Sequence, residues 1–390
     1  MSTTPSVAAP GATPHTHGLG SIVPVQTRNE RPSSFVIADF PKVTGREVDW
    51  KQTPVAKVHD LIGDKVDGSR VDVDSSISGS ASVSWVSMSD SVVGSAGKPE
   101  DRASAVAWES TQDALLIDIT ADDVSEVTVT RSGFTSTPQA AHTVIRVAPF
   151  AKTTVVLVSE GDASLTENVE IVAGESSNVT VISLQQWNSS ARHLATHFTR
   201  TEKAASVTHV VVTLSGDIVR VNPQTQLVGE GSEVNMLGLY FADSGEHLEH
   251  QVYVHHVGPQ TKSRVNYKGA LQGQGARTVW IGDVLIGQDA VGTDSYEQNR
   301  NLILTEGTRA DSIPNLEIKT GDIAGAGHAS ATGRFDDEQL FYLQARGISE
   351  EQARQLVVRG FLNEIVQQIE VPAVAQRIEA ALDAELEAIS

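Results

Sequence analysis

Residues 317 to 347 read EIKTGDIAGAGHASATGRFDDEQLFYLQARG and mark the point where the chain changes from strands to helices. The segment 317–320 is predicted to be a short strand. The segment 321–333 consists mostly of small residues with one histidine, His328, and is predicted to be a loop. Asp336 follows as the predicted N-cap of a helix, because its carboxylate can accept hydrogen bonds from the first free N–H groups. A strand-rich region therefore ends here and a helical region begins.

The region from Ala114 to Thr332 contains short runs of β-branched residues that recur without helical segments between them. This spacing predicts an all-β unit. The Asn-Gly and Asp-Gly hairpin turns that are typical of a sandwich or barrel are almost absent. A right-handed parallel β-helix instead needs regular strands with small-residue corners, such as Gly273-Gln274-Gly275. A sandwich stays open, but the spacing favours the β-helix, whose two ends need caps.

The chain divides into four predicted segments. Residues 1–34 are rich in Thr, Pro, Ser, Gly and Ala and are predicted to be a disordered tail. Residues 35–113 form a mixed N-terminal region, in which alternating Val and Ser between 63 and 112 indicate short exposed strands. Residues 114–335 are the predicted β-helix core. Residues 336–390 are the predicted C-terminal helical domain, so the fold class is mainly β with flanking helical segments.

The C-terminal segment has the apolar period of amphipathic helices. Ser349 and Gln352 stand in capping-box positions at the start of the second of these helices. The apolar side chains with helical spacing include Leu340, Phe341, Leu356, Phe361 and Ile365. Such a stripe is either core against its own domain or a docking surface for a partner.

Composition excludes several classes of protein. The chain carries 29 basic and 49 acidic residues, a net charge of −20, and such a surface repels nucleic acid and anionic membranes. No apolar run reaches the roughly 18–20 residues of a membrane helix, and the N-terminus shows no signal pattern, so a cytoplasmic location is predicted. The chain has no cysteine, which excludes disulfides, thiolate nucleophiles and Cys-based metal sites made by this chain alone.

Histidines offer the main candidates for chemistry. His15 and His17 lie in the predicted tail, His193 and His197 share one face of a strand, and further histidines stand between 247 and 256. No neighbouring carboxylate completes a metal-site spacing, so we interpret them as ordinary structural histidines. No nucleophile elbow, phosphate loop or zinc-protease motif is present. These observations indicate a scaffold or binding protein, with a stand-alone β-helix carbohydrate-active enzyme or adhesin as the alternative.

The C-terminal third resembles the SufB/SufD family of scaffold proteins for iron–sulfur cluster assembly. The resemblance rests on the segments 293–304, 310–318 and 337–348, within a matching region from about Lys268 to Gln367. The N-terminal motif Gly45-Arg46-Glu47, with Trp50-Lys51 and Thr53-Pro54, is most similar to SufD, and the absence of cysteine agrees.

The resemblance implies a non-catalytic scaffold subunit with two partners. The β-helix is expected to pair with a SufB-like sister scaffold, and the C-terminal helices with a SufC-like ABC ATPase. A homodimer stays open when these partners are absent. His328 matches the family's histidine and is the expected ligand of iron or of a transient cluster shared with SufB. The family's cysteine position falls on Ala326, so the cluster is expected to belong mainly to SufB.

Overall fold

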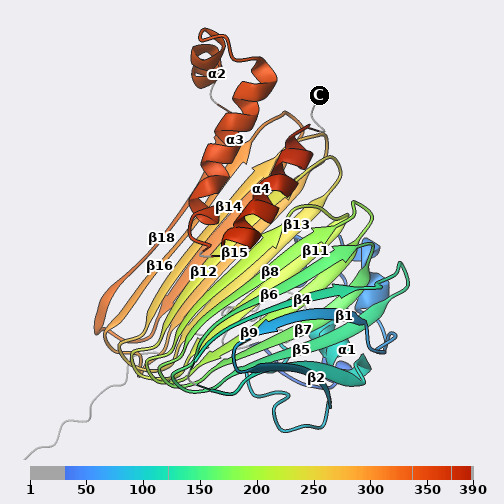
Figure 1. Cartoon of the computed structure of the whole chain (residues 1–390), viewed down its shortest axis with the longest axis vertical. Coiled ribbons are helices and arrows are strands. Elements are labelled where there is room, and N and C mark those ends of the chain that lie inside the picture. Colours follow the sequence, from blue (N-terminus) through green and yellow to red (C-terminus); the bar gives the residue numbers. More distant parts are fainter. Residues whose placement is uncertain (1–30, 122, 336, 370, 388–390) are drawn as a thin grey trace, which may run out of the picture. The chain divides into compact units, whose positions relative to one another are not determined.

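The computed structural model describes residues 31–121, 123–335, 337–369 and 371–387. The predicted tail, apart from its end, lies outside the described residues, as do His15, His17 and the predicted cap Asp336. All named elements belong to the unit Pro32–Ser390 (Figure 1). None of the described helices combines the length and apolar character needed to cross a membrane.

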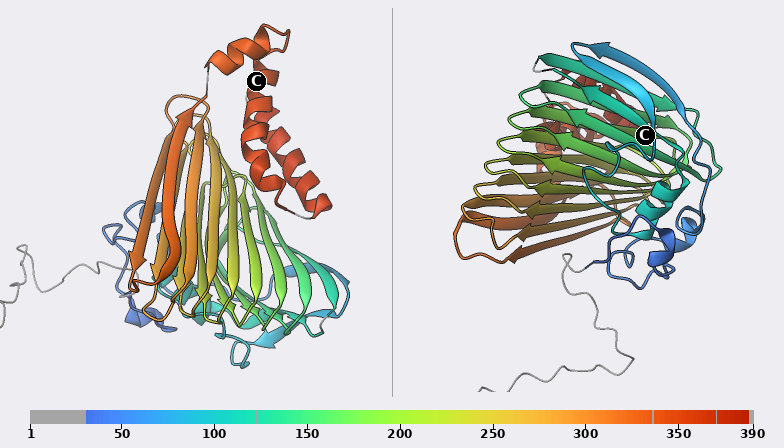
Figure 2. Two further views of the ribbon diagram at one scale, coloured as in Figure 1. Left: turned by 90° about the vertical axis from the view of Figure 1, so that its left-hand side faces the viewer. Right: turned by 90° about the horizontal axis from the view of Figure 1, so that it is seen from below.

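Two nine-stranded sheets face each other across a common core, and the chain alternates between them (Figures 1 and 2). The even sheet, named for its even-numbered strands from β4 onward, contains, in order, β1 (Asp72–Ser78), β4 (Val124–Ser132), β6 (Lys152–Gly161), β8 (Asn178–Trp187), β10 (Ser206–Thr213), β12 (Glu233–Ala242), β14 (Lys262–Leu271), β16 (Thr293–Ile303) and β18 (Ile323–Arg334). The odd sheet, named for its odd-numbered strands from β3 onward, contains, in order, β2 (Ala81–Ser87), β3 (Asp113–Ile119), β5 (Gln139–Val147), β7 (Ser164–Ala173), β9 (Arg192–Thr201), β11 (Ile218–Leu227), β13 (His247–His256), β15 (Arg277–Ile286) and β17 (Arg309–Ile318).

Each coil of this solenoid contributes one strand to each sheet, so that neighbouring strands in a sheet are parallel. The exceptions are the first strands, because β1 pairs with β4 and β2 pairs with β3 in antiparallel fashion. These two strands form the N-terminal end of the stack, which we refer to as the closed end. The solenoid confirms the predicted parallel β-helix and removes the sandwich as an alternative.

One corner of the solenoid repeats the same backbone conformation in successive coils. Phe150, Ser176, Ala204 and Gln260 have positive φ angles between 55° and 66° although none of them is glycine. The N–H of each corner residue donates to a carbonyl of the next coil, as from Gln260 to Val291 at 2.7 Å. The ladder satisfies backbone groups that would otherwise be buried without partners.

The main core lies between the two sheets and consists of side chains that point inward from alternate strand positions, such as Ile145, Val181 and Val254. The outer face of the odd sheet is covered by the N-terminal segment with η2 (Ile37–Asp39), η3 (Val55–Lys57), η4 (His59–Leu61) and α1 (Arg102–Ser110). The outer face of the even sheet is covered by C-terminal helices (Figure 2). Each end of the chain therefore covers one sheet.

The C-terminal helices are α2 (Asp337–Gln344), α3 (Glu350–Val366) and α4 (Pro372–Glu387). The predicted capping box is confirmed, since the Gln352 N–H donates to Ser349 Oγ and the Ser349 N–H donates to Gln352 Oε1. The helices that flank the solenoid at both ends of the chain confirm the predicted fold class.

The loop predicted at 321–333 is wrong, because most of this segment is β18. Its small side chains lack β propensity, but its backbone pairs with β16 over eleven positions. The strand predicted around His193 and His197 is confirmed as β9, whereas β14, whose sequence contains many polar residues, was not predicted. Strand pairing between coils outweighs local propensity here, because neighbouring coils supply a partner to every inner strand.

Candidate functional site

The last coil, formed by β17 and β18, is the C-terminal end of the solenoid, where the two sheets end in strands of 10 and 12 residues. Within the described part of the chain, β17 pairs only with β15 and β18 pairs only with β16. Both strands are therefore sheet edges, and most of their side chains are partly or fully exposed. An edge of unpaired N–H and C=O groups is a template for pairing with another chain. We refer to this last coil as the open end.

His328 lies on β18 at the open end, in register with Glu297 of β16. Its Nδ1 atom is 3.9 Å from Glu297 Oε1, and its side chain is 44% exposed whereas that of Glu297 is only 1% exposed. Neither carboxyl oxygen of Glu297 has a hydrogen-bond partner. Burial, with a smaller contribution from Asp283, raises the pKa of Glu297 to about 8. The open end therefore holds a buried carboxyl group that has no hydrogen-bond partner among the described residues, with His328 3.9 Å away.

A hydrogen-bonded polar cluster lies beside this pair. The Tyr240 hydroxyl donates to Asn301 Oδ1 at 2.7 Å and accepts from Asn299 Nδ2 at 2.8 Å. Ser312 of β17 donates to Asn299 Oδ1 at 2.7 Å and thereby links the two sheets. The cluster therefore connects β16, the strand that carries Glu297, with β12 and with β17 of the other sheet.

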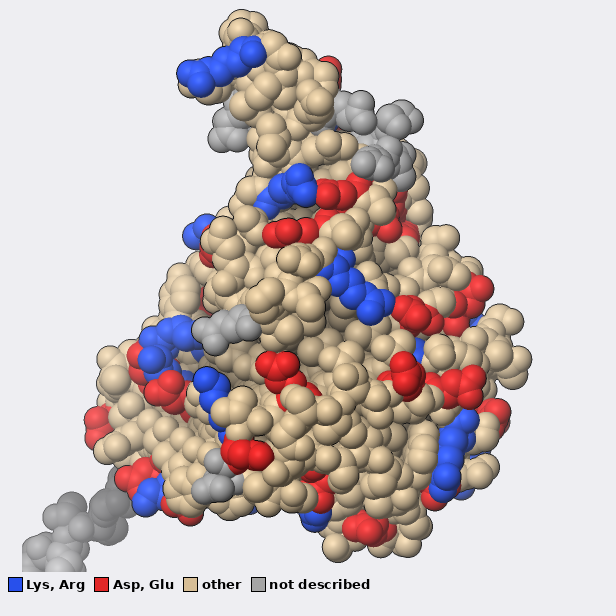
Figure 3. Space-filling view, viewed as in Figure 1, with Lys and Arg blue, Asp and Glu red and all other residues tan. Residues whose placement is uncertain are grey.

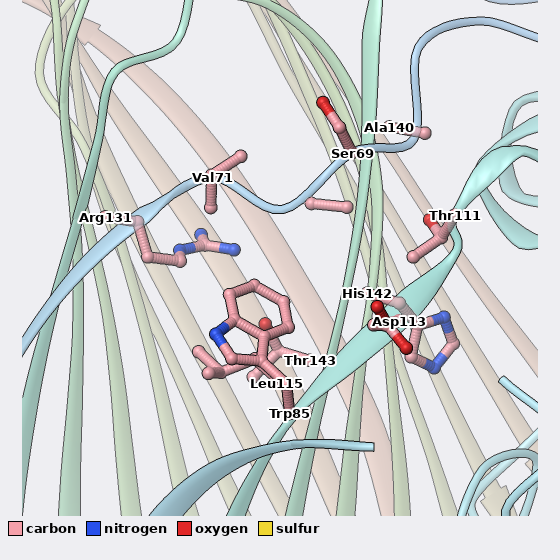
Figure 4. Close-up of a pocket in the computed structure, with 11 residues that line it drawn as sticks. Ser69, Val71, Trp85, Thr111, Asp113, Leu115, Arg131, Ala140, His142 and Thr143 are labelled. Atoms are coloured by element: carbon pink, nitrogen blue, oxygen red, sulfur yellow. The ribbon is translucent and has the colours of Figure 1, made fainter. Parts of the chain in front are cut away.

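The opposite end of the solenoid holds a buried ionic cluster that is largely satisfied. Arg131 contacts Glu167 through both terminal nitrogens, and Glu167 Oε1 is 2.8 Å from His193 Nε2. Burial alone would raise the pKa of Glu167, but Arg131 and His193 outweigh it and lower the pKa below its usual range. A small cavity beside this cluster lies between Arg131 and Val71 on one side and Thr111 and His142 on the other (Figure 4).

The predicted structural role of the other histidines agrees with their surroundings. His193 and His197 both lie inside the solenoid, but His193 bonds to Glu167 and His197 bonds to His209 at 3.1 Å. His247 bonds to Glu249, and His250 bonds to Thr213. No group of three His, Asp or Glu side chains converges as a metal site anywhere in the described residues.

The residues predicted to bind a partner through the C-terminal helices fall into two groups. Ile365 is fully buried against strands of the even sheet, Phe361 packs on the edge of the same cluster, and Leu340 is also buried. Lys268 of β14 reinforces this packing, because its ammonium group lies over the Phe361 ring. Phe341 and Leu356, in contrast, are exposed large apolar side chains.

Charge does not mark the free surface of these helices. Figure 3 shows acidic and basic side chains scattered over the face that carries α3 and α4. Several are paired, such as Arg359 with Asp383 and Arg377 with Glu160. Exposed apolar side chains are therefore the more distinctive feature of the helical segment.

The open end can offer His328 as an imidazole ligand to a metal or cluster, with the Glu297 carboxyl group behind it. An imidazole suits iron, but one ligand is too few for a complete site, so the remaining ligands would come from elsewhere. Sequence reasoning singled out His328 and missed Glu297. Contacts between neighbouring coils join residues 28 positions apart in one region, as in Ser125–Thr153, and 32 apart in another, as in Ser263–Ser295. A search of the sequence for carboxylates about one coil, or roughly 28–32 residues, before His328 could have found Glu297.

Comparisons with known proteins agree with this geometry. The family model for the SUF system FeS cluster assembly SufBD core domain matches residues 128–361. The chain is similar to the iron–sulfur cluster assembly SufBD family protein ML0594 of Mycobacterium leprae, with 42% identity over 378 residues, 94% of this chain and 96% of that protein. It is equally similar to Rv1462 of Mycobacterium tuberculosis, with 42% identity over 401 residues, 98% of this chain and 97% of that protein.

A second SufBD family protein of Mycobacterium tuberculosis, Rv1461, is more distant. It is 27% identical over 201 residues, 52% of this chain and 24% of that protein. One organism thus carries two SufBD proteins that both resemble this chain. These matches confirm the resemblance found in the sequence and favour the scaffold hypothesis over a carbohydrate-active enzyme or adhesin.

Proposed function

The chain belongs to the SufBD family of SUF-system iron–sulfur cluster assembly proteins, and on that premise we propose that it is a non-catalytic scaffold subunit of the assembly complex. In this proposal the open end of the solenoid pairs with a SufB-like sister scaffold. The C-terminal helices bind a SufC-like ABC ATPase. The complex works in the cytoplasm, and the cluster is its product rather than a resident cofactor of this chain.

The observation that carries the proposal is the unfinished last coil. Within the described residues, β17 and β18 each have a strand partner on one side only, and with 10 and 12 residues they are longer edges than β1 and β2, which have 7 residues each. A second solenoid of the same family would continue both sheets. The existence of two SufBD proteins in one organism supports a pair of unlike members.

The missing cysteine supports a division of labour between the two scaffolds. Iron–sulfur clusters are held mainly by thiolates, and this chain has none. His328 can contribute one imidazole from the edge strand that faces the proposed partner. The thiolates then have to come from the sister scaffold, so the cluster is shared and transient on this chain.

Pairing through the open end can be tested with two matched isoleucines. Ile318 on β17 at the open end and Ile77 on β1 at the closed end are 43% and 42% exposed. The full chain is co-expressed with the SufB-like and SufC-like proteins of the same organism, and complexes are analysed by size-exclusion chromatography. Ile318→Lys should lose the sister scaffold and Ile77→Lys should keep it. Loss from both variants, or from neither, would contradict pairing at this end.

Docking of the ATPase can be tested with two exposed phenylalanines. Phe341 lies on α2, whereas Phe150 lies at a corner of the solenoid. In the same co-expression, Phe341→Ala with Leu356→Ala should weaken retention of the ATPase, because buried apolar anchors dominate such interfaces. Phe150→Ala should leave it unchanged. Full retention by the double variant would show that the ATPase binds elsewhere.

A further inference from the structure

The pairing of Glu297 with His328 is fixed by the sheet rather than by flexible side chains. Strands β16 and β18 run parallel, and the positions two residues before and after the pair are also in register, Ser295 with Ala326 and Asn299 with Ser330. In-register residues of parallel strands project from the same face of a sheet. The carboxyl group therefore stands directly behind the imidazole, on the side away from the open edge.

Glu297 differs from the other buried glutamates of the solenoid. Glu167, Glu170 and Glu249 all bond to nearby histidines. Both oxygens of Glu297 are buried and without a hydrogen-bond partner. A buried carboxyl group without a partner costs stability, so its presence calls for a role that stability does not explain.

The fold leaves room for this carboxyl group. Gly282 of β15 faces it from the other sheet, and a Cβ atom at this position would lie 2.5 Å from Glu297 Oε2. Any other residue at 282 would therefore push the carboxyl group from its place. Gly282 therefore leaves the space that the Glu297 carboxyl group occupies, one strand behind His328.

The chemistry of the imidazole ring indicates how a carboxylate behind His328 would act on it. An imidazole that binds a metal through Nε2 carries its proton on Nδ1, and a carboxylate that accepts this proton orients the ring and makes it a stronger ligand. Nδ1 of His328 is the ring atom that faces Glu297. The opposite ring nitrogen, Nε2, is then left for a ligand beyond the open edge.

We propose that Glu297 is the positioning residue of His328, and that it accepts the Nδ1 proton so that Nε2 is presented to iron at the open end. The inference rests on the proposed function for the identity of the metal. The present separation of 3.9 Å has to shorten to about 3.2 Å or less for this hydrogen bond to form. Glu297 itself does not contact the iron.

The proton position on His328 gives a test that needs no partner. The full chain is labelled with ¹⁵N-histidine, and His328→Gln identifies the His328 signals. Spectra are recorded at about pH 9, well above the ordinary pKa of histidine side chains, so that ring tautomers rather than imidazolium are observed. We expect the proton on Nδ1 in the wild type, and a shift toward the Nε2–H form in Glu297→Leu.

Glu297→Gln is the matched control, because its amide keeps an acceptor oxygen of nearly the same shape. This variant should retain the Nδ1–H form, which separates hydrogen bonding from mere packing. The same tautomer in the wild type and in Glu297→Leu would overturn the proposal. So would a wild type with the proton on Nε2.

Iron binding to the reconstituted complex provides the second readout. Glu297→Leu should bind ferrous iron about 10–100-fold more weakly than the wild type, with the sister scaffold still bound. A complex that forms normally and binds iron equally well in both forms would overturn the role of Glu297. Failure of the complex to form would instead count against the proposed function, while the tautomer would still decide the role of Glu297.

Discussion

The two ends of the solenoid differ in whether a buried glutamate has hydrogen-bond partners. At the closed end, two antiparallel strands cover the stack, and the carboxylate of Glu167 is held by Arg131 and His193. At the open end, Glu297 is equally buried but has no hydrogen-bond partner, and the strand edges beside it are unpaired within the described residues. The buried carboxylate near the closed end is therefore paired within the described residues, whereas the one at the open end has no hydrogen-bond partner there.

The difference follows from the energetics of buried ions. Two opposite charges in the interior regain their lost hydration only when they are close together and hydrogen-bonded. Glu167 meets that condition, and its pKa is lowered despite burial. Glu297 does not, and burial raises its pKa to about 8. A site that tolerates this cost is typical of functional rather than structural positions.

The largest expected effect comes from making the closed end resemble the open end. Arg131→Met leaves Glu167 buried without its main partner and should lower the free energy of unfolding by about 3–5 kcal/mol. Urea denaturation measures the change. Arg146→Met is the matched control, because Arg146 forms an ion pair with Asp118 on the outer surface. It should cost about 1 kcal/mol or less, and equal losses would contradict the distinction between the two sites.

The C-terminal helices offer the same contrast between buried and free side chains. Ile365→Ala removes a fully buried side chain from the contact between α3 and the even sheet. It should cost about 2–5 kcal/mol and promote local unfolding of the helices, seen as faster amide exchange in α3 and α4. Leu356→Ala, on the exposed side of α3, should change exchange very little. Similar exchange in the two variants would contradict the observed docking of α3.

The effect of Glu297 on the stability of the folded protein should depend on pH. Because the pKa of Glu297 is raised in the folded state, its destabilising effect is absent below the unfolded value of about 4.5 and grows as pH rises toward 8. Glu297→Leu should therefore gain stability relative to the wild type by about 3–4 kcal/mol more at pH 8 than at pH 5. Thermal denaturation at both pH values measures this gain. A difference that does not vary with pH would show that Glu297 is neutralised by a group not identified in the structure.

The smallest expected effect concerns the corners that both ends share. Gln260 adopts a φ of 55°, a conformation that glycine adopts without strain, and Gly231 and Gly292 occupy the same place in neighbouring coils with φ of 68° and 72°. Gln260→Gly should stabilise the protein by about 0.5–1 kcal/mol, since relief of strain exceeds the added chain entropy. Gly231→Ala should do the reverse. A loss of stability in Gln260→Gly would show that its side chain matters more than its backbone.

Sequence reasoning found most of the architecture but few of the contacts that define the site. The β-branched runs and the scarcity of hairpin turns favoured a β-helix while leaving a sandwich open, and the capping box at Ser349 predicted a C-terminal helix. The segment 321–333 was predicted to be a loop, because its glycines and alanines have low strand propensity. It is strand β18, since β16 supplies its hydrogen bonds. Propensity describes a residue alone, whereas strand formation here depends on the neighbouring coil.

The sequence by itself determined the repeating β architecture, the acidic charge and the absence of thiolate ligands, because composition and local periodicity are properties of the chain alone. Only the tertiary structure brought Glu297 behind His328 and placed Arg131, Glu167 and His193 together. The spacing between such partners changes from 28 to 32 residues along the solenoid. No fixed period relates them, so the contacts are set by how each coil turns and stacks on the previous one.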